Sequence, residues 1–418
     1  MNRITVPGDK SVSHRALILA ALGAGRSRIR GLLRSADIES TADVLRALGV
    51  AIPNLAALEL VVDGVGLRGL SAPTASLDCG NSGTTARLMA GVVAGAGIHA
   101  RFVGDASLSA RPMRRVAAPL EAMGATITLS SAGTLPMELL GGALRGVTWR
   151  PDVASAQVKG AVLLAGLVGG VPVEVHEPAA TRDHTERMLR ARGVSVVSEG
   201  LTVSLQPKGP LTAADVAVPG DPSSAAFFAG LAAIGGAGEG IALESVGVNP
   251  GRMGAFQVLE RMGARVRYES TRDSAGEPVA TLLVGPRELH GTELSSDEIP
   301  SLIDELPLLA CVAACADGET RVTGAAELRV KESDRIRAIV ENLRAVGGHA
   351  EELPDGFIVR GSGRPLRGRV VTKGDHRIAM AFAILGAAAG NAIDVDDPSC
   401  AGVSYPTFWD ELARVRER

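Results

Sequence analysis

The stretch VPGDKSVSHR (residues 6–15) brings a lysine, a serine and an arginine to the expected start of an apolar helix. Free backbone N–H groups and the helix dipole favour an anion at such a helix start. Lys10, Ser11 and Arg15 would strengthen this preference, so the stretch predicts a site for a phosphate or a carboxylate. The alternative is that Ser11 or Ser13 only caps the helix, next to two solvated cations.

Five further apolar helices are predicted to begin with polar residues, and cations stand beside three of these starts. The starts are CGNSGTT (79–85) with Arg87, SAQ (155–157) with Lys159, DPSS (221–224), SLIDE (301–305) and KGDHR (373–377). Ordinary capping explains their Ser, Thr, Asn and Asp residues but not the cations. If the helix starts of each half gather at one end, they would form an electropositive cleft.

Three loops and two acids complete the candidate residues. The loops are GDASLSARP (104–112) with Arg111, RDH (182–184) with Arg182, and RVKESDR (329–335) with Arg335. Asp304 stands among apolar residues, where partial desolvation near cations could tune its pKa for proton transfer, and Glu332 beside Lys331 could be tuned likewise. The alternatives are that Asp304 caps a helix ahead of Pro307 and that residues 329–335 are a solvated helix start.

A repeating set of elements spaces these residues along the chain. VPGD recurs after 212 residues, at 6–9 and 218–221, which divides the chain into two related halves. The apolar helices are predicted to open near Ser13, Thr84, Ala156, Ser223, Ser301 and His376 and to stop at Gly23, Gly95, Gly169, Gly235, Gly318 and Gly390. Amphipathic helices are predicted to end in LxxxG at 45–49, 120–124, 189–193, 259–263 and 343–347, and a sixth covers 408–415.

The repeat predicts an α/β (α+β) fold in two domains. Each copy has the order strand, buried helix, strand, amphipathic helix and two strands, a βαβαββ unit, and the first strand is expected at residues 4–6. Three units per half would place the apolar helices inside and the sheets outside, as an inside-out barrel. The length of 418 residues agrees with two domains of about 200 residues each.

The composition excludes several classes of protein. The net charge is −3, so cations for an anionic ligand must be gathered locally, and an aromatic content of 3% argues against single-stranded nucleic acid as a partner. The chain has no GxxxxGK loop, no GxGxxG followed by an acid and no metal-ligand spacing. Neither a signal peptide nor a membrane-spanning run is present, so no membrane partner is expected.

The four cysteines predict a reducing compartment, the cytoplasm. They are Cys79, Cys311, Cys315 and Cys400, and none forms a CxxC pair. Cys311 and Cys315 are four residues apart in an apolar run, so both are expected in the core, facing one way. Cys79 could be a nucleophile at a helix start. It has no histidine partner nearby, however, so a small buried residue is expected there.

Nine stretches resemble the 5-enolpyruvylshikimate-3-phosphate synthases, a family of enolpyruvyl transferases. They are PGDKSVSHRALILAAL, LDCGNSGTTARL, GDASLSARPM, SAQVKGAVLLAGL, TRDHTERML, VPGDPSSAAF, IDELPLLA, RVKESDRI and DHRIAMA. The resemblance implies two domains of three βαβαββ units, joined by two crossovers, with the active site in the interdomain cleft. Residues 1–9 and 220–418 would form domain I, closed by the N-terminal strand, and residues 10–219 would form domain II.

The resemblance also implies an activity in the shikimate pathway, toward chorismate and the aromatic amino acids. The 5-hydroxyl of shikimate 3-phosphate would add to C2 of phosphoenolpyruvate as C3 is protonated, and the intermediate would then lose phosphate. Fixed cations aimed at developing charge would be the main catalytic device. No cofactor or metal is implied, the only expected partners are the two small substrates, and the implied state is a monomer.

Individual site residues follow from the same resemblance. Shikimate 3-phosphate would be held by Lys10, Ser11, Arg15, Ser155, Ala156, Gln157, Arg182, Asp304 and Lys331. Phosphoenolpyruvate would be held by Lys10, Asn81, Gly83, Arg111, Gln157, Arg335 and Arg377. Asp304 would be the base for the 5-hydroxyl, and Glu332 would handle the C3 proton with the help of Lys10 or Lys331.

Two other functions compete with this one. UDP-N-acetylglucosamine enolpyruvyl transferases share the fold and the chemical logic, but they carry a cysteine at the position of Ala106 and lack the Lys10-Ser11 pair. A non-catalytic anion-binding module on the same scaffold would bind phosphate esters without turnover. The presence of Asp304 and Glu332 together with the cations argues against such a module.

Overall fold

The computed structural model describes residues 1–416, which form two compact units. Unit 1 contains Met1–Pro7, Pro219–Arg272 and the residues from Pro278 onward. Unit 2 contains Gly8–Val218 and the short segment Asp273–Glu277. Residues 273–277, which the sequence placed with 220–418, therefore pack with the other half of the chain.

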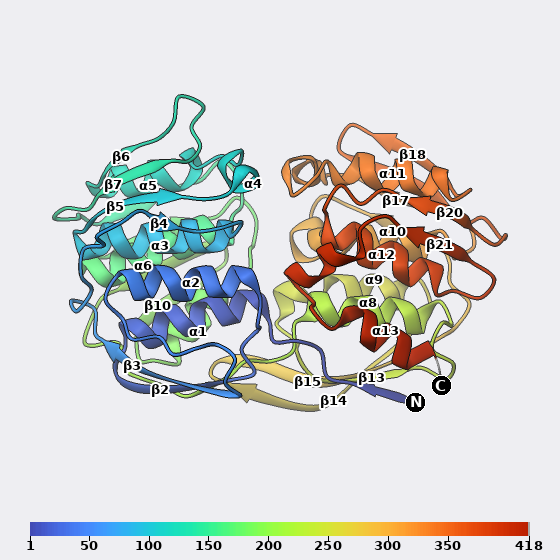
Figure 1. Ribbon diagram of the computed structural model, residues 1–418, viewed down its shortest axis with the longest axis horizontal. Helices are drawn as coiled ribbons and strands as arrows, with labels where there is room; N and C mark the ends of the chain where they lie inside the picture. The colour runs from blue at the N-terminus through green and yellow to red at the C-terminus, as the bar shows by residue number, and fades with distance from the viewer. Residues whose placement is uncertain (417–418) are drawn as a thin grey trace. The chain divides into compact units, whose positions relative to one another are not determined.

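Unit 2 is a mixed α/β structure in which short sheets flank a stack of helices (Figure 1). Its helices are α1 (Lys10–Leu22), α2 (Ala36–Ala47), α3 (Gly83–Ala96), α4 (Ala106–Ser109), α5 (Arg114–Met123), α6 (Ala156–Gly169) and α7 (His184–Arg190). Its strands are β2 (Ala24–Arg30), β3 (Glu59–Val65), β4 (Leu77–Asp78), β5 (His99–Val103), β6 (Thr126–Thr128), β7 (Met137–Leu140), β8 (Val147–Trp149), β9 (Val173–His176), β10 (Ser195–Glu199), β11 (Thr202–Gln206) and β12 (Val216–Ala217). The sheet orders are β12-β2-β3, β4-β5-β7-β6 and β10-β11-β9-β8.

Unit 1 has the same kind of architecture. Its helices are α8 (Pro222–Ala233), α9 (Gly254–Arg261), α10 (Leu306–Ala313), α11 (Arg335–Ala345), α12 (His376–Gly386) and α13 (Phe408–Arg416). The 3₁₀ turns are η1 (Pro250–Arg252), η2 (Ile299–Ser301), η3 (Ile303–Glu305), η4 (Ala326–Val330) and η5 (Pro398–Val403). Its strands are β1 (Asn2–Ile4), β13 (Ile241–Gly247), β14 (Arg265–Ser274), β15 (Glu277–Gly285), β16 (Glu293–Leu294), β17 (Glu319–Val322), β18 (His349–Leu353), β19 (Gly356–Arg360), β20 (Arg367–Val370) and β21 (Ala392–Val395). The sheet orders are β1-β13-β15-β14, β16-β17-β19-β18 and β20-β21.

The strand pairing follows a recurring pattern and shows that two strands join the sheets of the other unit. A parallel pair at one edge and an antiparallel hairpin at the other recur in four of the sheets formed by residues 1–416. β1 precedes α1 in the chain but lies parallel to β13 of unit 1. β12 precedes α8 but lies parallel to β2 of unit 2. The strand ahead of each half's first helix thus completes a sheet of the other unit.

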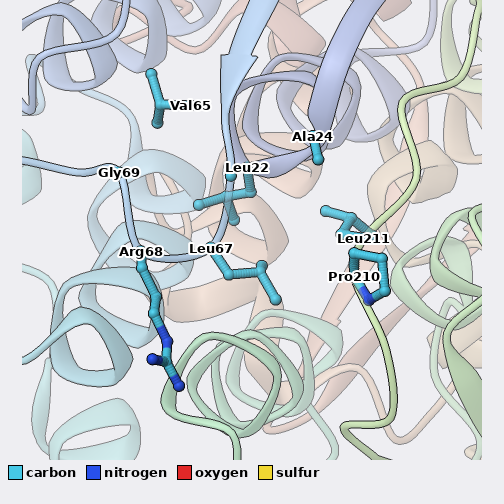
Figure 2. Close-up of a pocket in the computed structure, with 9 residues that line it drawn as sticks. Leu22, Ala24, Val65, Leu67, Arg68, Gly69, Pro210 and Leu211 are labelled. Atoms are coloured by element: carbon cyan, nitrogen blue, oxygen red, sulfur yellow. The ribbon is translucent and has the colours of Figure 1, made fainter.

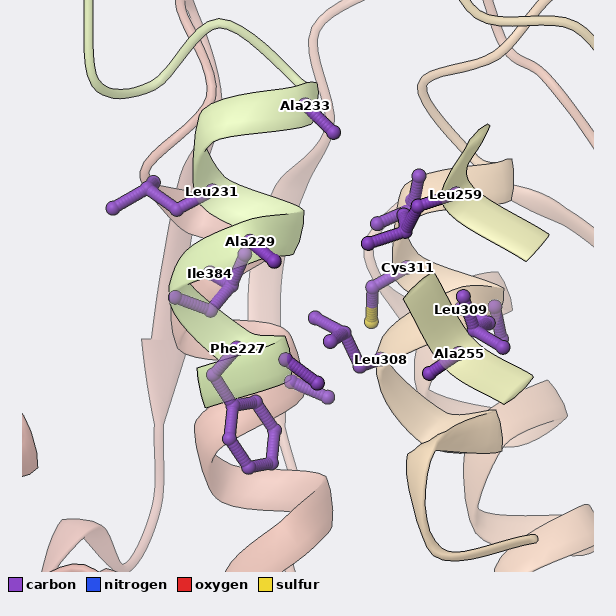
Figure 3. Close-up of a cluster of buried hydrophobic side chains, with 14 of the residues drawn as sticks. Phe227, Ala229, Leu231, Ala233, Ala255, Leu259, Leu308, Leu309, Cys311 and Ile384 are labelled. Carbon is purple, nitrogen blue, oxygen red and sulfur yellow. The ribbon is translucent and has the colours of Figure 1, made fainter. Parts of the chain in front are cut away.

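The apolar helices form the centre of each unit because they have no polar face to leave in water. Every residue of α8 is buried, and so are most residues of α1, α3, α6 and α12. Figure 3 shows Phe227 of α8, Leu308 of α10 and Ile384 of α12 within the core of unit 1. The mixed α/β class predicted from the sequence is confirmed.

The helix starts follow the predicted capping chemistry, with one correction. Side chains of Asp9, Ser82, Ser155, Asp221 and Asp375 cap five of the six buried helices in the described chain. In the first helix Asp9 accepts from the Val12 N–H at 2.8 Å, so neither serine is the cap. Ser13 is buried and accepts from the Leu33 N–H at 3.0 Å. Lys10 is therefore the first helical residue, and the helix begins three residues before the predicted Ser13.

The predicted glycine stops are correct for the amphipathic helices and for three of the six buried helices in the described chain. Positive φ angles occur at Gly49, Gly124, Gly193, Gly263 and Gly347, the five LxxxG glycines. Among the buried helices, Gly23 is the C-cap as predicted. Gly169 is the last residue of α6, and Gly235 directly follows the C-cap of α8 with a positive φ. Gly95 instead lies inside α3, and Gly318 and Gly390 lie several residues beyond the ends of α10 and α12.

Three smaller predictions are also decided by the structure. The first strand is Asn2–Ile4 rather than residues 4–6. Cys79 is buried as predicted, and burial raises the pKa of its thiol to about 12. Cys311 is buried but Cys315 is exposed, because α10 ends at Ala313 and the predicted i, i+4 pairing on one helix face is lost. Within residues 1–416, the helices are too short or too polar to cross a membrane.

Candidate active site

The predicted base Asp304 lies in the 3₁₀ turn η3, immediately before α10. A helix opening at Ser301 was predicted, but Pro300 and Pro307 lack the N–H groups that a continuous helix would need there. The chain instead makes two 3₁₀ turns, and α10 starts at Leu306. No side chain caps α10, so the alternative role of Asp304 as an N-cap is wrong.

Two cations approach the carboxylate of Asp304. Its Oδ1 atom lies 3.5 Å from Nζ of Lys331 and 3.6 Å from Nη1 of Arg335. The side chain of Arg335 is 1% exposed, whereas that of Lys331 is 31% exposed. The arrangement combines an acid–base group with a partly accessible ammonium that can meet an anion.

Arg335 is held by two acids, Glu332 and Asp375. Its Nη2 donates to Glu332 at 2.6 Å, and its Nε and Nη2 donate to Asp375 at 2.8 and 3.2 Å. Burial opposes the charge of Arg335, but Glu332 and Asp375 raise its pKa above the usual value. Burial would likewise raise the pKa of Asp375, yet Arg335 lowers it below the usual range. Arg335 and Asp375 therefore form a buried ion pair, and Glu332 contacts it through Arg335.

Arg377 joins this cluster from the first turn of α12. Its Nη1 donates to the backbone oxygen of Asp304 at 3.0 Å and lies 3.5 Å from Oε1 of Glu305. Ser223 donates to the same Glu305 oxygen and accepts from Arg252 at 2.7 Å. Unit 1 thus brings Asp304, Lys331, Glu332, Arg335 and Arg377 together.

In unit 2, the start of α1 holds Lys10, Ser11 and Arg15. Lys10 forms an ion pair with Asp37 of α2 at 3.1 Å. Arg15 is buried, and its Nη1 donates back to the Ser11 carbonyl at 2.9 Å. Its Nε donates to Thr185 at 2.7 Å. Burial lowers the pKa of Arg15, and the positive charge of Arg182 lowers it further.

The starts of α3 and α6 meet around a second arginine, Arg87. Its Nη1 donates to Gln157 at 2.8 Å, and Gln157 in turn donates to Thr84 at 3.0 Å. A Cβ atom added to Gly83 would lie 2.7 Å from Nη1 of Arg87 and 3.5 Å from Nη1 of Arg111. Burial, together with the neighbouring cation Arg111, lowers the pKa of Arg87 to about 10. Two guanidinium groups therefore share the space beside Gly83.

The remaining predicted residues line the same helix starts. Arg111 donates to Asn81 at 2.8 Å, and Asn81 donates to Asp105 at 2.7 Å. Ser155 caps α6 through the Val158 N–H at 3.4 Å, which leaves Ala156 and Gln157 in the first turn. The predicted residues of unit 2 thus form three neighbouring groups, around Lys10, around Arg15 with Arg182, and around Gln157 with Arg111.

The structure adds partners for the predicted site residues that the sequence did not show. Arg87 and Asp375 stood in the predicted helix starts, but only the structure shows that they hold Gln157 and Arg335. Asp37 and Thr185 had no sequence signal because their partners are 27 and 170 residues away. Alternation of charges within the helix starts could have suggested Asp375, which lies two residues before Arg377.

No group of three or more potential metal ligands occurs among residues 1–416. An apolar pocket of about 490 Å³ lies at the other end of α1, where Leu22, Val65 and Leu67 line it (Figure 2). Because α1 has 13 residues, about 20 Å of helix separates this pocket from Lys10. The pocket is therefore not part of the cluster of site residues.

Comparison with known proteins gives a consistent result over the whole chain. The family model described as "EPSP synthase (3-phosphoshikimate 1-carboxyvinyltransferase)" matches residues 1–412. A 3-phosphoshikimate 1-carboxyvinyltransferase of Sulfurihydrogenibium sp. is 47% identical over 417 residues, which cover 99% of this chain and 96% of the relative. One of Xanthomonas campestris pv. campestris is 48% identical over 412 residues, 98% of this chain and 93% of the relative.

Solved structures agree with the family model. EPSP synthase from Acinetobacter baumannii superposes with a TM-score of 0.88 at 43% identity, covering 99% of this chain and 95% of that one. The enolpyruvyl transferase NikO from Streptomyces tendae shares the fold, with a TM-score of 0.76 at 19% identity over 99% of this chain and 94% of that one. The chain belongs to the EPSP synthase (3-phosphoshikimate 1-carboxyvinyltransferase) family.

Proposed function

We propose that the chain is a 3-phosphoshikimate 1-carboxyvinyltransferase. It transfers the enolpyruvyl group of phosphoenolpyruvate to the 5-hydroxyl of shikimate 3-phosphate and releases inorganic phosphate. The observation that carries the proposal is the position of Asp304, whose carboxylate lies 3.5 and 3.6 Å from Lys331 and Arg335. An acid–base group among fixed cations is what addition to an anionic substrate requires.

The two substrates together carry two phosphates and two carboxylates, and the cations of both units bind these anionic groups. The group around Arg15 and Arg182 binds shikimate 3-phosphate, together with Ser11 and the start of α6 at Ser155 and Ala156. Lys10, Arg111, Arg335 and Arg377 bind phosphoenolpyruvate, with Asn81, Gly83 and Gln157 beside them. The support for these roles is that each named side chain stands at a helix start or pairs with one that does.

The chemistry proceeds in two steps. In the first, Asp304 takes the 5-hydroxyl proton as the oxygen adds to C2 of phosphoenolpyruvate, and Glu332 gives a proton to C3. In the second, the tetrahedral intermediate loses a C3 proton and the C2–O bond to phosphate breaks, so that the double bond forms again. Lys331 and Lys10 balance the charge that develops on the phosphate and the carboxylate. The proton count closes because Glu332 recovers a proton from C3 in the second step, and the hydroxyl proton held by Asp304 passes to the departing phosphate.

Phosphate release from purified protein mixed with both substrates tests the proposal. We expect release that depends on both substrates and that falls by about 10²–10⁴-fold in Asp304→Asn, while shikimate 3-phosphate still binds. Asp297→Asn is the matched control, since Asp297 is an exposed aspartate of the same unit. Tight binding of shikimate 3-phosphate without any release would instead indicate an anion-binding module, and release with a UDP-sugar acceptor would indicate the related transferase.

We also propose the finer architecture that accompanies this function. The six buried helices and their sheets form an inside-out barrel of six βαβαββ units, with residues 1–9 and 220–418 as domain I and 10–219 as domain II. The recurring strand order and the exchange of β1 and β12 support it. The protein acts as a cytoplasmic monomer, which size-exclusion chromatography with light scattering can test by giving a mass near 42.8 kDa.

A further inference from the structure

The tip of the β14–β15 hairpin packs with unit 2, although the rest of both strands belongs to unit 1. Ser274 donates to the Ala217 carbonyl at 2.7 Å. Ala275 packs against the apolar core of unit 2. Gly276 has a φ of 89°, and a Cβ atom there would lie 2.8 Å from the backbone oxygen of Arg187 in α7. The tip therefore lies directly against α7, closer than any other residue type would allow.

The next residue, Glu277, forms a buried hydrogen bond with the first residue of α7. Its Oε1 accepts from Nδ1 of His184 at 2.9 Å, and both side chains are 2% exposed. Removing one member of such a buried pair is costly because the polar group that remains loses this hydrogen bond in a place that water does not reach. The pair therefore fixes the start of α7 to the hairpin tip.

The start of α7 lies within the loop that carries the proposed shikimate 3-phosphate ligands. Arg182 stands two residues before His184, and Thr185 follows it and accepts from Arg15 at 2.7 Å. Glu186 then pairs with Lys159 of α6 at 2.7 Å. Lys159 in turn lies two residues after Gln157. A shift at His184 would therefore move Arg182 and the support of Arg15 together.

We propose that Glu277 is a positioning residue for the shikimate 3-phosphate site and that it acts through His184 on Arg182 and Thr185. The inference rests on the proposed function of this site. Neither Glu277 nor His184 needs to touch a substrate. Their contribution is to hold a loop in place, and displacements of about 1 Å are enough to weaken a site of this kind. The proposed phosphoenolpyruvate ligands Arg335 and Arg377 are held instead by Asp375 and by the backbone oxygen of Asp304.

Steady-state kinetics of Glu277→Ala, His184→Ala and the double variant test this inference. We expect the KM for shikimate 3-phosphate to rise about tenfold or more in each single variant. The KM for phosphoenolpyruvate should stay within about twofold, and the double variant should be no worse than the worse single variant, because both remove the same contact. Calorimetric binding of shikimate 3-phosphate should weaken by the same factor as the KM.

The control uses another histidine–glutamate pair of unit 2. His176 and Glu174 on β9 lie 2.7 Å apart but are partly exposed, at 23% and 40% of their side chains. Glu174→Ala should therefore leave both KM values unchanged. If Glu277→Ala does not fold, Ser274→Ala replaces it, since it removes only the hydrogen bond of the tip to Ala217 and should raise the same KM to a smaller extent.

The outcomes separate this inference from the proposed function. Parallel increases in both KM values, or single-variant effects that add in the double variant, would show a merely structural role and overturn the inference. Absence of turnover in the wild type would contradict the proposed function instead, and the binding measurement would then decide the role of Glu277 on its own.

Discussion

His14 should make unit 2 lose stability as the pH falls from 7 to 5. Its imidazole is completely buried at the second turn of α1, and Nδ1 lies 2.7 Å from the hydroxyl of Thr41. Burial, reinforced by the positive charges of Lys10 and Arg15 and only partly offset by Asp37, lowers the pKa of His14 from 6.5 to about 3. The folded chain therefore keeps His14 neutral at pH values where the unfolded chain protonates it.

The sign and size of the effect follow from proton linkage. Between pH 6.5 and 3 the unfolded state binds one more proton at His14 than the folded state, so the free energy of unfolding falls as the pH is lowered. At pH 5 the loss at this one residue is about 2 kcal/mol relative to pH 7. For a unit of this size that corresponds to a fall in Tm of about 4–8 °C.

The assay compares the pH dependence of the wild type with that of His14→Asn. Asn keeps a polar group near Thr41 but has no proton to gain, so the variant should lose about 2 kcal/mol less between pH 7 and 5. The chain has two tryptophans, Trp149 in unit 2 and Trp409 in unit 1. In a Trp409→Phe background, urea unfolding followed by fluorescence therefore reports on unit 2 alone.

A control and a refuting result complete the test. His99, with a side chain that is 67% exposed, lies on β5 of the same unit, so His99→Asn should keep the pH dependence of the wild type. The absolute stability of His14→Asn at pH 7 will be lower because its side chain is smaller and leaves a cavity. The test therefore compares only how the free energy of unfolding changes with pH in the two proteins. If the wild type and His14→Asn lost the same free energy between pH 7 and 5, the reasoning from burial would be refuted.

Three further predictions concern single contacts. Gly83→Ala should raise the KM for phosphoenolpyruvate about tenfold, because the new Cβ would lie 2.7 Å from Nη1 of Arg87 and displace the guanidinium from Gln157. An unchanged KM would contradict this prediction. Gly160→Ala should raise the KM for shikimate 3-phosphate instead, since its Cβ would lie 3.0 Å from the Thr185 hydroxyl that holds Arg15. Arg192→Met should leave Tm unchanged or raise it. The side chain of Arg192 is 1% exposed, its Nε and Nη2 have no hydrogen-bond partner among the described residues, and burial lowers its pKa to about 10. A clear fall in Tm would contradict this prediction and show that Arg192 has a partner.

The elements that the sequence predicted best are those whose signal is local. Asp, Ser or Asn beside an apolar run marks a helix start, and five of the six buried helices have such a cap within residues 1–416. LxxxG likewise predicted the ends of the amphipathic helices, because the glycine there takes the left-handed conformation. These features depend on a few neighbouring residues, so the sequence alone contains them.

Predictions failed where two local signals competed. Gly95 and Gly97 are both able to end α3, and the helix continues to the second of them. Before α10, the apolar run suggested a helix from Ser301, but two prolines divide it into 3₁₀ turns and place Asp304 in a turn. The candidate base thereby leaves the helix and presents its backbone oxygen to Arg377.

The residues that hold the site residues in place could not be predicted from the sequence for a different reason. Glu277 and His184 are 93 residues apart, and Arg15 and Thr185 are 170 apart, so no spacing rule connects them. Their types also carried no signal, since a lone glutamate at a hairpin tip is usually solvated. Only burial distinguishes Glu277 from such a residue. The groups that meet substrate can thus be predicted from helix starts, whereas the groups that hold them in place become visible only when the chain is folded.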